Sequence, residues 1–152
     1  MPQPLKRHPA LQPLSREHHQ ILLLGFKIRQ GLKNNIDHQR IVDYCIWFYS
    51  SFHLQHVEHE AHHFEHILGK HSEIYVRLKQ NHKNVIHAFK DLKSSYLDLK
   101  TFEELIVSHV REEERVLYQE LQAQLTPEAI HYLETNLTEL DFHDRFKDIF
   151  WQ

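Results

Sequence analysis

Apolar residues recur three and four positions apart over long stretches of this chain, and no stretch shows the strict alternation of a half-buried β-strand. This spacing predicts four long helices, at about residues 15–33, 37–68, 72–92 and 101–125. Ser15 is a suitable N-cap for the first helix, and Gly69 is a natural C-cap for the second. Thr101-Phe102-Glu103-Glu104 has the spacing of a capping box and is expected to open the fourth.

A fifth helix is predicted from Thr126, an N-cap followed by proline, to the apolar ending FKDIFW. Residues 1–13 hold four of the five prolines and are expected to form an extended lead-in. The predicted fold is all-α: an antiparallel up-down-up-down four-helix bundle at residues 14–125, with an additional C-terminal helix at residues 126–152 packed on it. The aromatic residues Phe146, Phe150 and Trp151 either pack on the bundle or form a homodimer contact.

Composition and charge exclude several function classes. The formal net charge is -3, and the 18 Lys and Arg residues are scattered among acids, so a nucleic-acid surface is not expected. No apolar run approaches the ~20 residues of a membrane span, and the N-terminal residues lack the apolar core of a signal peptide. A single cysteine, Cys45, allows no intrachain disulfide and is expected in the core. These features predict a cytoplasmic protein with no membrane or nucleic-acid partner.

Sixteen histidines are the abnormal feature of the composition, and the segment HLQHVEHEAHHFEH at residues 53–66 holds six of them. At about 100° per residue, His56, Glu60 and His63 fall on the apolar face of their helix. His63 is either an additional metal ligand or a hydrogen-bonding partner of one. The remaining histidines of the segment are expected at the surface: His53, His59, His62 and His66.

On the other predicted helices, histidine or glutamate residues also interrupt the apolar face. His109 and Glu113 share an inward face, whereas Glu114 points outward on a regular helix. His18 and His82 are the inward histidines of the first and third helices. At about 1.5 Å per residue, an antiparallel bundle brings these positions to one height. The candidate site consists of His18, His56, Glu60, His82, His109 and Glu113.

Two carboxylates among four histidines in a protein interior indicate a metal site. An unpaired buried carboxylate costs several kcal/mol, so it needs a cation or hydrogen-bonding partners. Imidazole and carboxylate without thiolate favour iron, manganese or zinc. Six ligands exceed what one ion normally needs, and two ions bridged by the carboxylates would use them all.

Around these residues the sequence resembles the hemerythrin-like family, whose members carry the HHE cation-binding domain. The resemblance rests on LSREHHQI at residues 14–21, HVEHE at 56–60, Asn81-His82, and HVREE at 109–113 followed by Leu117-Tyr118. It covers roughly residues 10–122. The resemblance implies a non-haem centre of two iron ions with an oxo or hydroxo bridge. It implies terminal imidazole ligands at His18, His56, His82 and His109, and bridging carboxylates at Glu60 and Glu113.

Two departures from the oxygen-carrying members of that family affect the functional expectation. Those carriers have a further histidine one turn before the third-helix ligand, where this chain has Leu78. Their fourth-helix carboxylate follows its histidine at a slightly longer spacing, which would select Glu114 in place of Glu113. One iron would then be less saturated, completed by water or by a residue such as His63. Such an iron favours redox reaction or sensing over reversible oxygen transport.

The leading functional hypothesis is a di-iron protein that binds or senses O2, NO or peroxide, or handles iron under oxidative or nitrosative stress. One alternative is an enzyme with the same centre, either a di-iron oxidoreductase or an iron-donating repair protein. The other is a metal-buffering helical module in which the outer histidines matter most. No separate acid–base constellation in the sequence identifies a substrate.

Overall fold

A computed structural model describes residues 6–152, so the first five residues of the expected lead-in lie outside the described range. Residues 6–152 are largely helical and contain no β-strand. The helices are α1 (Gln12–Lys33), α2 (His38–Phe48), α3 (Leu54–Leu68), α4 (Glu73–Lys93), α5 (Leu99–Glu112), α6 (Tyr118–Ala123) and α7 (Pro127–Asn136). A 3-10 turn, Pro9–Leu11, precedes α1. The π-helical turns Tyr49–His53 and Glu113–Leu117 join α2 to α3 and α5 to α6.

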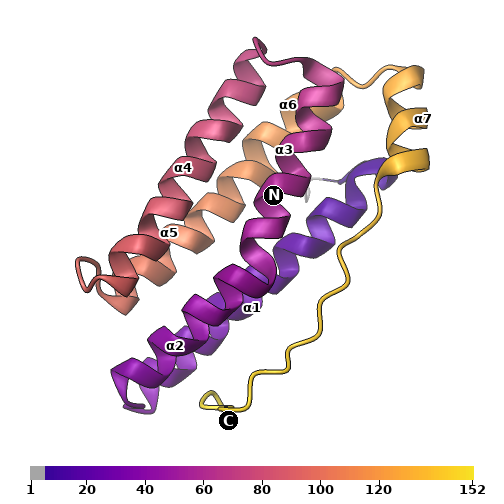
Figure 1. The fold of residues 1–152 in the computed structure, drawn as a ribbon. Helices are drawn as coiled ribbons and strands as arrows, with labels where there is room; N and C mark the ends of the chain where they lie inside the picture. The colour runs from indigo at the N-terminus through magenta and orange to yellow at the C-terminus, as the bar shows by residue number, and fades with distance from the viewer. Residues whose placement is uncertain (1–5) are drawn as a thin grey trace, which may run out of the picture.

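The long helices lie side by side, with α1 packed on α5 and α4 packed on both α3 and α5 (Figure 1). Two of the long helices begin earlier than predicted. Ser15 lies inside α1, which begins at Gln12 and has proline in its first turn. The N-cap of α5 is Asp98, whose carboxylate accepts a hydrogen bond from Thr101 N at 2.7 Å, so Thr101 lies within the helix. Gly69 ends α3 with φ +85°, a conformation that suits glycine.

Two apolar clusters fill the interior, one on each side of the polar layer that contains the candidate site. On each long helical segment, one residue of each cluster flanks that layer. These flanking pairs are Leu14 and Ile21, Phe64 and Phe52, Leu78 and Val85, and Leu117 and Ile106. The polar residues between them therefore lie at one height, enclosed by apolar side chains that keep water out.

The two π-helical turns lie next to the candidate site and change which side chains face inward. On a regular helix Tyr118 would point away from His109 by about half a turn. The wider turn that begins at Glu113 brings Tyr118 into the interior, where it is fully buried. Turns of this kind are rare in proteins, and those that do occur often lie at functional sites.

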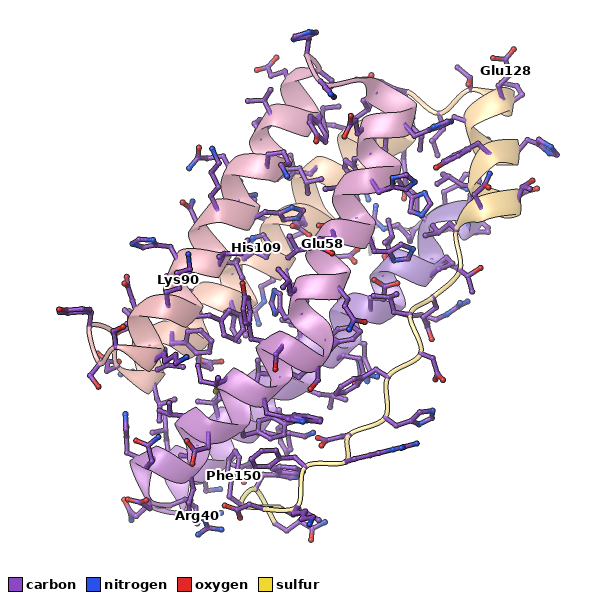
Figure 2. All side chains as sticks on the ribbon, viewed as in Figure 1. Arg40, Glu58, Lys90, His109, Glu128 and Phe150 are labelled. Atoms are coloured by element: carbon purple, nitrogen blue, oxygen red, sulfur yellow. The ribbon has the colours of Figure 1, made fainter. Side chains whose placement is uncertain are left out.

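The C-terminal residues differ from the prediction of one helix through FKDIFW. Helix α7 ends at Asn136, and residues 137–152 form an extended C-terminal strap that runs along the outside of the helices (Figure 1). Phe150 of the strap, labelled in Figure 2, is buried. Its ring lies next to Gly31 of α1. Asp144 accepts a hydrogen bond from Lys27 Nζ at 2.6 Å and another from Tyr44 Oη. These tertiary contacts outweigh the helix propensity of the segment.

Among the described residues, no helix is both long enough and apolar enough to cross a membrane. The aromatic side chains of the C-terminal strap pack against the chain's own helices, and the homodimer contact stays a prediction.

Candidate metal centre

The six residues selected from the sequence lie together in the interior. Their ligand atoms form two groups that share Glu113: His18, His56, Glu60 and Glu113 in one, and His82, His109 and Glu113 in the other. Within each group the atoms lie within 4.8 Å of one another. His109 is 7% exposed and the other five residues are at most 2% exposed. We call the part around His18 and His56 the first half, and the part around His82 and His109 the second half. Buried groups of this composition could hold a metal ion.

The Glu113 carboxylate lies between the two halves. Its Oε2 is 2.8 Å from Nε2 of His18 in the first half. Its Oε1 is 2.8 Å from Nε2 of His109 and 3.5 Å from Nε2 of His82 in the second half. Glu113, and not Glu114, therefore occupies the shared position.

Glu60 is arranged in the same way. Its Oε2 is 3.1 Å from His18 Nε2 and 3.7 Å from His56 Nε2, and its Oε1 is 2.6 Å from His82 Nε2. Each carboxylate thus directs one oxygen to each half, and all four histidines turn Nε2 towards these oxygens.

The close contacts fit metal ligation better than direct hydrogen bonding at several atoms. Both oxygens of Glu113 and Nε2 of His56 are buried and form no hydrogen bond of acceptable geometry within residues 6–152. Two ligand atoms bonded to one ion at about 2.0–2.1 Å and at right angles are separated by about 3 Å. Contacts of 2.8 Å without hydrogen-bond geometry are what lone pairs directed at a common point produce.

Two further carboxylates hold the histidines of the first half by accepting hydrogen bonds from Nδ1, the ring nitrogen that faces away from the ligand layer. His56 Nδ1 donates to Glu17 Oε1 at 2.8 Å, and His18 Nδ1 donates to Glu114 Oε1 at 2.7 Å. A carboxylate on the second ring nitrogen is typical of metal-ligating histidine, because it fixes the tautomer and the ring orientation. In the second half, Nδ1 of His82 is buried with no hydrogen-bond partner among the described residues. The two halves therefore differ in charge outside the ligand layer.

Glu17 and Tyr118 are site residues that the sequence analysis missed. Glu17 reaches His56 on another helix, so the only signal in the sequence is its position next to His18. Tyr118 donates a hydrogen bond to Glu60 Oε2 and stacks on His18, with ring centroids 5.2 Å apart. Burial and the carboxylates Glu60, Glu113 and Glu114 hold the pKa of Tyr118 well above its ordinary value, so its phenol remains a donor.

The buried carboxylates and imidazoles shift one another's pKa values. Burial alone would lower the pKa of His18, but the nearby Glu113 carboxylate and the hydrogen-bonded carboxylates of Glu114 and Glu60 outweigh burial and hold it well above its ordinary value. The same competition raises the pKa of His82 to about 9. Burial would raise the pKa of Glu113, yet the surrounding histidines hold it well below its ordinary value. The carboxylates are ionised, which is the form that binds a cation.

The other histidines of residues 53–66 divide into three kinds. The prediction of a surface position is wrong for His53, which is fully buried and packs against Phe89 with ring centroids 4.9 Å apart. His62 and His66 are exposed as predicted, and His59 is partly exposed. His63 is outside both ligand groups, and its Nδ1 lies 3.0 Å from Tyr132 Oη.

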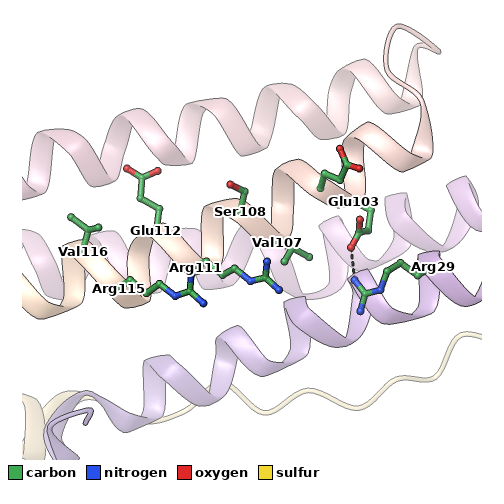
Figure 3. A pocket seen from close by; sticks show the side chains of 9 residues that line it. Arg29, Glu103, Val107, Ser108, Arg111, Glu112, Arg115 and Val116 are labelled. Atoms are coloured by element: carbon green, nitrogen blue, oxygen red, sulfur yellow. Dashed lines mark hydrogen bonds and ion pairs between the residues drawn. The ribbon is translucent and has the colours of Figure 1, made fainter. Parts of the chain in front are cut away.

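Grooves on the surface bear on access to the centre. One of about 740 Å³ is lined by Arg29 of α1, by α5 and by the π-helical turn that follows it, includes Arg111 and Arg115, and touches none of the six candidate ligands (Figure 3). In it, Arg29 forms an ion pair with Glu103. A smaller groove of about 170 Å³ between α4 and α5 is lined in part by His109. His109 is also the most exposed of the six candidate ligands, so the second half lies nearest to solvent.

Comparisons with known protein families, with curated proteins and with solved structures gave no match. The resemblance to the hemerythrin-like family therefore depends on the sequence motifs alone.

Proposed function

We propose that this chain is a hemerythrin-like, non-haem di-iron protein that binds or senses O2, NO or peroxide, or handles iron under oxidative or nitrosative stress. The proposal includes an antiparallel up-down-up-down four-helix bundle as the scaffold, and a cytoplasmic location. Glu60 and Glu113 would hold two iron ions between the halves, and each half would supply two imidazoles.

The observation that carries this proposal is the division of the carboxylate oxygens between the two halves. Glu60 and Glu113 each direct Oε2 to the first half and Oε1 to the second. A single ion in either half would leave one oxygen of each carboxylate, and two imidazoles, without a cation. Two ions would engage all of the buried charge.

Iron is proposed on two grounds. The donor set of imidazole and carboxylate suits iron, manganese and zinc, and the resemblance to the hemerythrin-like family favours iron among these. Bound iron would supply one-electron redox chemistry and affinity for small oxygen and nitrogen ligands.

The chain's own residues would set how the centre reacts. The apolar clusters on both sides exclude bulk water, and Leu78 occupies the position where the oxygen carriers have a further histidine. Glu17 and Glu114 hold His56 and His18 in place through Nδ1. The first half offers four protein atoms and the second offers three, with Glu60 Oε1 also 2.6 Å from His82 Nε2. Iron held there would keep open positions of the kind that reactive metal sites keep. Because the second half lies nearest to solvent, we propose that exogenous ligands approach from that side.

Two alternatives differ from this proposal, the first in what the interior centre does and the second in which residues hold the metal. In a di-iron oxidoreductase or an iron-donating repair protein, the open positions would serve turnover or iron release. Steady-state turnover of peroxide or NO under reductant supports the enzyme, and stoichiometric binding without turnover counts against it. In a metal-buffering module the exposed histidines would hold the metal, so the double substitution His62→Ala/His66→Ala would remove it while the interior residues stayed intact.

Elemental analysis and the visible spectrum of protein purified without a histidine tag test the proposal. We expect two irons per chain and the charge-transfer bands of an oxo-bridged diferric centre. Iron well below two per chain, together with a spectrum without those bands, would overturn it.

A further inference from the structure

Four histidines of α3 that lie outside the candidate metal centre form two pairs at a spacing of four residues: His59 with His63, and His62 with His66. Residues four apart are neighbours on a helix surface, so the two rings of such a pair can reach one ion. The ring centroids of His59 and His63 are 4.9 Å apart, and those of His62 and His63 are 5.1 Å apart.

The rest of the chain holds the pair His59 and His63 by the ring nitrogen Nδ1. His59 Nδ1 donates to Glu17 Oε2 at 2.9 Å, and His63 Nδ1 lies 3.0 Å from Tyr132 Oη on α7. His59 Nδ1 donates to a carboxylate, so Nε2 of that ring keeps its lone pair free; in the tautomer in which His63 Nδ1 donates to Tyr132 Oη, Nε2 of His63 does the same. This is the arrangement that orients histidines for metal binding, with the outer partner on one nitrogen and the cation on the other.

The pair His62 and His66 has the same spacing without these anchors. Both side chains are exposed, and neither ring nitrogen has a hydrogen-bond partner among the described residues. His66 is held only by stacking on Tyr132, with ring centroids 3.7 Å apart. Nothing directs Nε2 of these two rings to one point. The two pairs therefore form a natural comparison on a single helix.

The environment of His63 also suits a cation. Burial and the neighbouring imidazoles lower the pKa of His63 to about 4. At neutral pH its ring carries no proton that an incoming cation must displace.

We propose that His59 and His63 form an outer metal site that binds a divalent transition-metal ion, such as Zn²⁺ or Cu²⁺, through their Nε2 atoms. Imidazole suits these ions, and water completes the coordination of a two-histidine site. Glu17 also accepts the hydrogen bond from His56 Nδ1. One carboxylate therefore connects a histidine of the outer site to a histidine of the interior centre. The outer site is independent of whether the interior residues hold iron.

Paramagnetic broadening by Cu²⁺ tests this site residue by residue. In ¹⁵N-labelled, untagged protein, less than one equivalent of Cu²⁺ is expected to broaden amide and imidazole signals of residues 59–63 first. In the variant His59→Ala/His63→Ala this broadening should be lost. In the matched variant His62→Ala/His66→Ala it should persist, with the Kd for Cu²⁺ changed less than about twofold. Circular dichroism checks that both variants fold.

A third variant separates the effect of the hydrogen-bonding partners on Cu²⁺ binding from the effect of the four-residue spacing. Tyr132→Phe removes the partner of His63 Nδ1 and keeps the ring on which His66 stacks, and we expect it to weaken Cu²⁺ binding about tenfold. Equal losses in the two double variants would overturn the proposal, because spacing alone would then explain binding. No broadening at residues 59–63, or broadening centred on residues 82 and 109, would overturn it as well. The iron content of the same samples reports separately on the interior centre.

Discussion

Glu113→Gln is the most informative substitution in the candidate metal centre. Glu113 is the residue common to both groups of ligand atoms, and it is fully buried. Glutamine keeps the size of the side chain and removes its charge. One of its two terminal atoms becomes an NH2 group, which has no lone pair to offer an ion held beside His18 or His109.

The expected magnitude follows from the burial of the group. Removing one partner of a buried charge pair costs about 3–5 kcal/mol. Since every 1.4 kcal/mol is a factor of ten, this corresponds to about two to four orders of magnitude in cation affinity. Glu113 contacts both halves, so the loss affects both ions. We expect protein purified as Glu113→Gln to hold fewer than one iron per chain.

Two neighbouring glutamates provide matched controls. Glu112 is exposed and outside the candidate metal centre, so Glu112→Gln should keep the full iron content. Glu114 accepts the hydrogen bond from His18 Nδ1. Loss of such an outer partner weakens metal affinity about 10–100-fold. Glu114→Gln should therefore bind the first-half ion more weakly and recover full occupancy in excess metal.

Anaerobic titration with Fe²⁺, followed by elemental analysis of desalted protein, measures these effects. Urea unfolding checks that each variant folds. Two irons per chain in Glu113→Gln would refute the bridging role. A larger loss in Glu114→Gln than in Glu113→Gln would select Glu114 as the shared carboxylate.

Three further substitutions test parts of the fold. His53→Leu should raise the unfolding free energy by about 1–3 kcal/mol in urea, because both ring nitrogens are buried with no hydrogen-bond partner in the described chain; a loss of iron instead would give His53 a role at the centre. The pKa of His63, about 4 when folded against an ordinary 6.5, gives a stability contribution that is present above pH 6.5 and lost as pH falls towards 4. After solvent screening it is on the order of 1 kcal/mol, and urea melts across this range should show it in wild type and not in His63→Gln. Phe150→Ala should cost about 3–5 kcal/mol, and a cost below about 1 kcal/mol would show that the C-terminal strap is weakly held.

Helical spacing was sufficient to predict that the six candidate residues lie together. His56 with Glu60, and His109 with Glu113, are pairs four residues apart on apolar faces, and a fixed rise per residue relates their heights to those of His18 and His82. Such local rules depend only on regular helix geometry. They therefore hold wherever the helices stay regular near the candidate metal centre.

The features that sequence reasoning missed depend on departures from regular helix or on contacts between distant segments. Tyr118 turns inward because of the π-helical turn at Glu113–Leu117, and no simple pattern predicts such a turn. Glu17 acquires its role from histidines on α3 and from the backbone N–H of Leu140 in the C-terminal strap. The strap itself is set by contacts such as those of Asp144, and helix propensity does not encode them.

Anomalous diffraction at the iron edge, from crystals of untagged protein, tests the central claim most directly. The proposal predicts two peaks per chain, one within reach of His18 and His56 and the other within reach of His82 and His109, with Glu60 and Glu113 contacting both. A single peak, or peaks only at the outer histidines of α3, would contradict it.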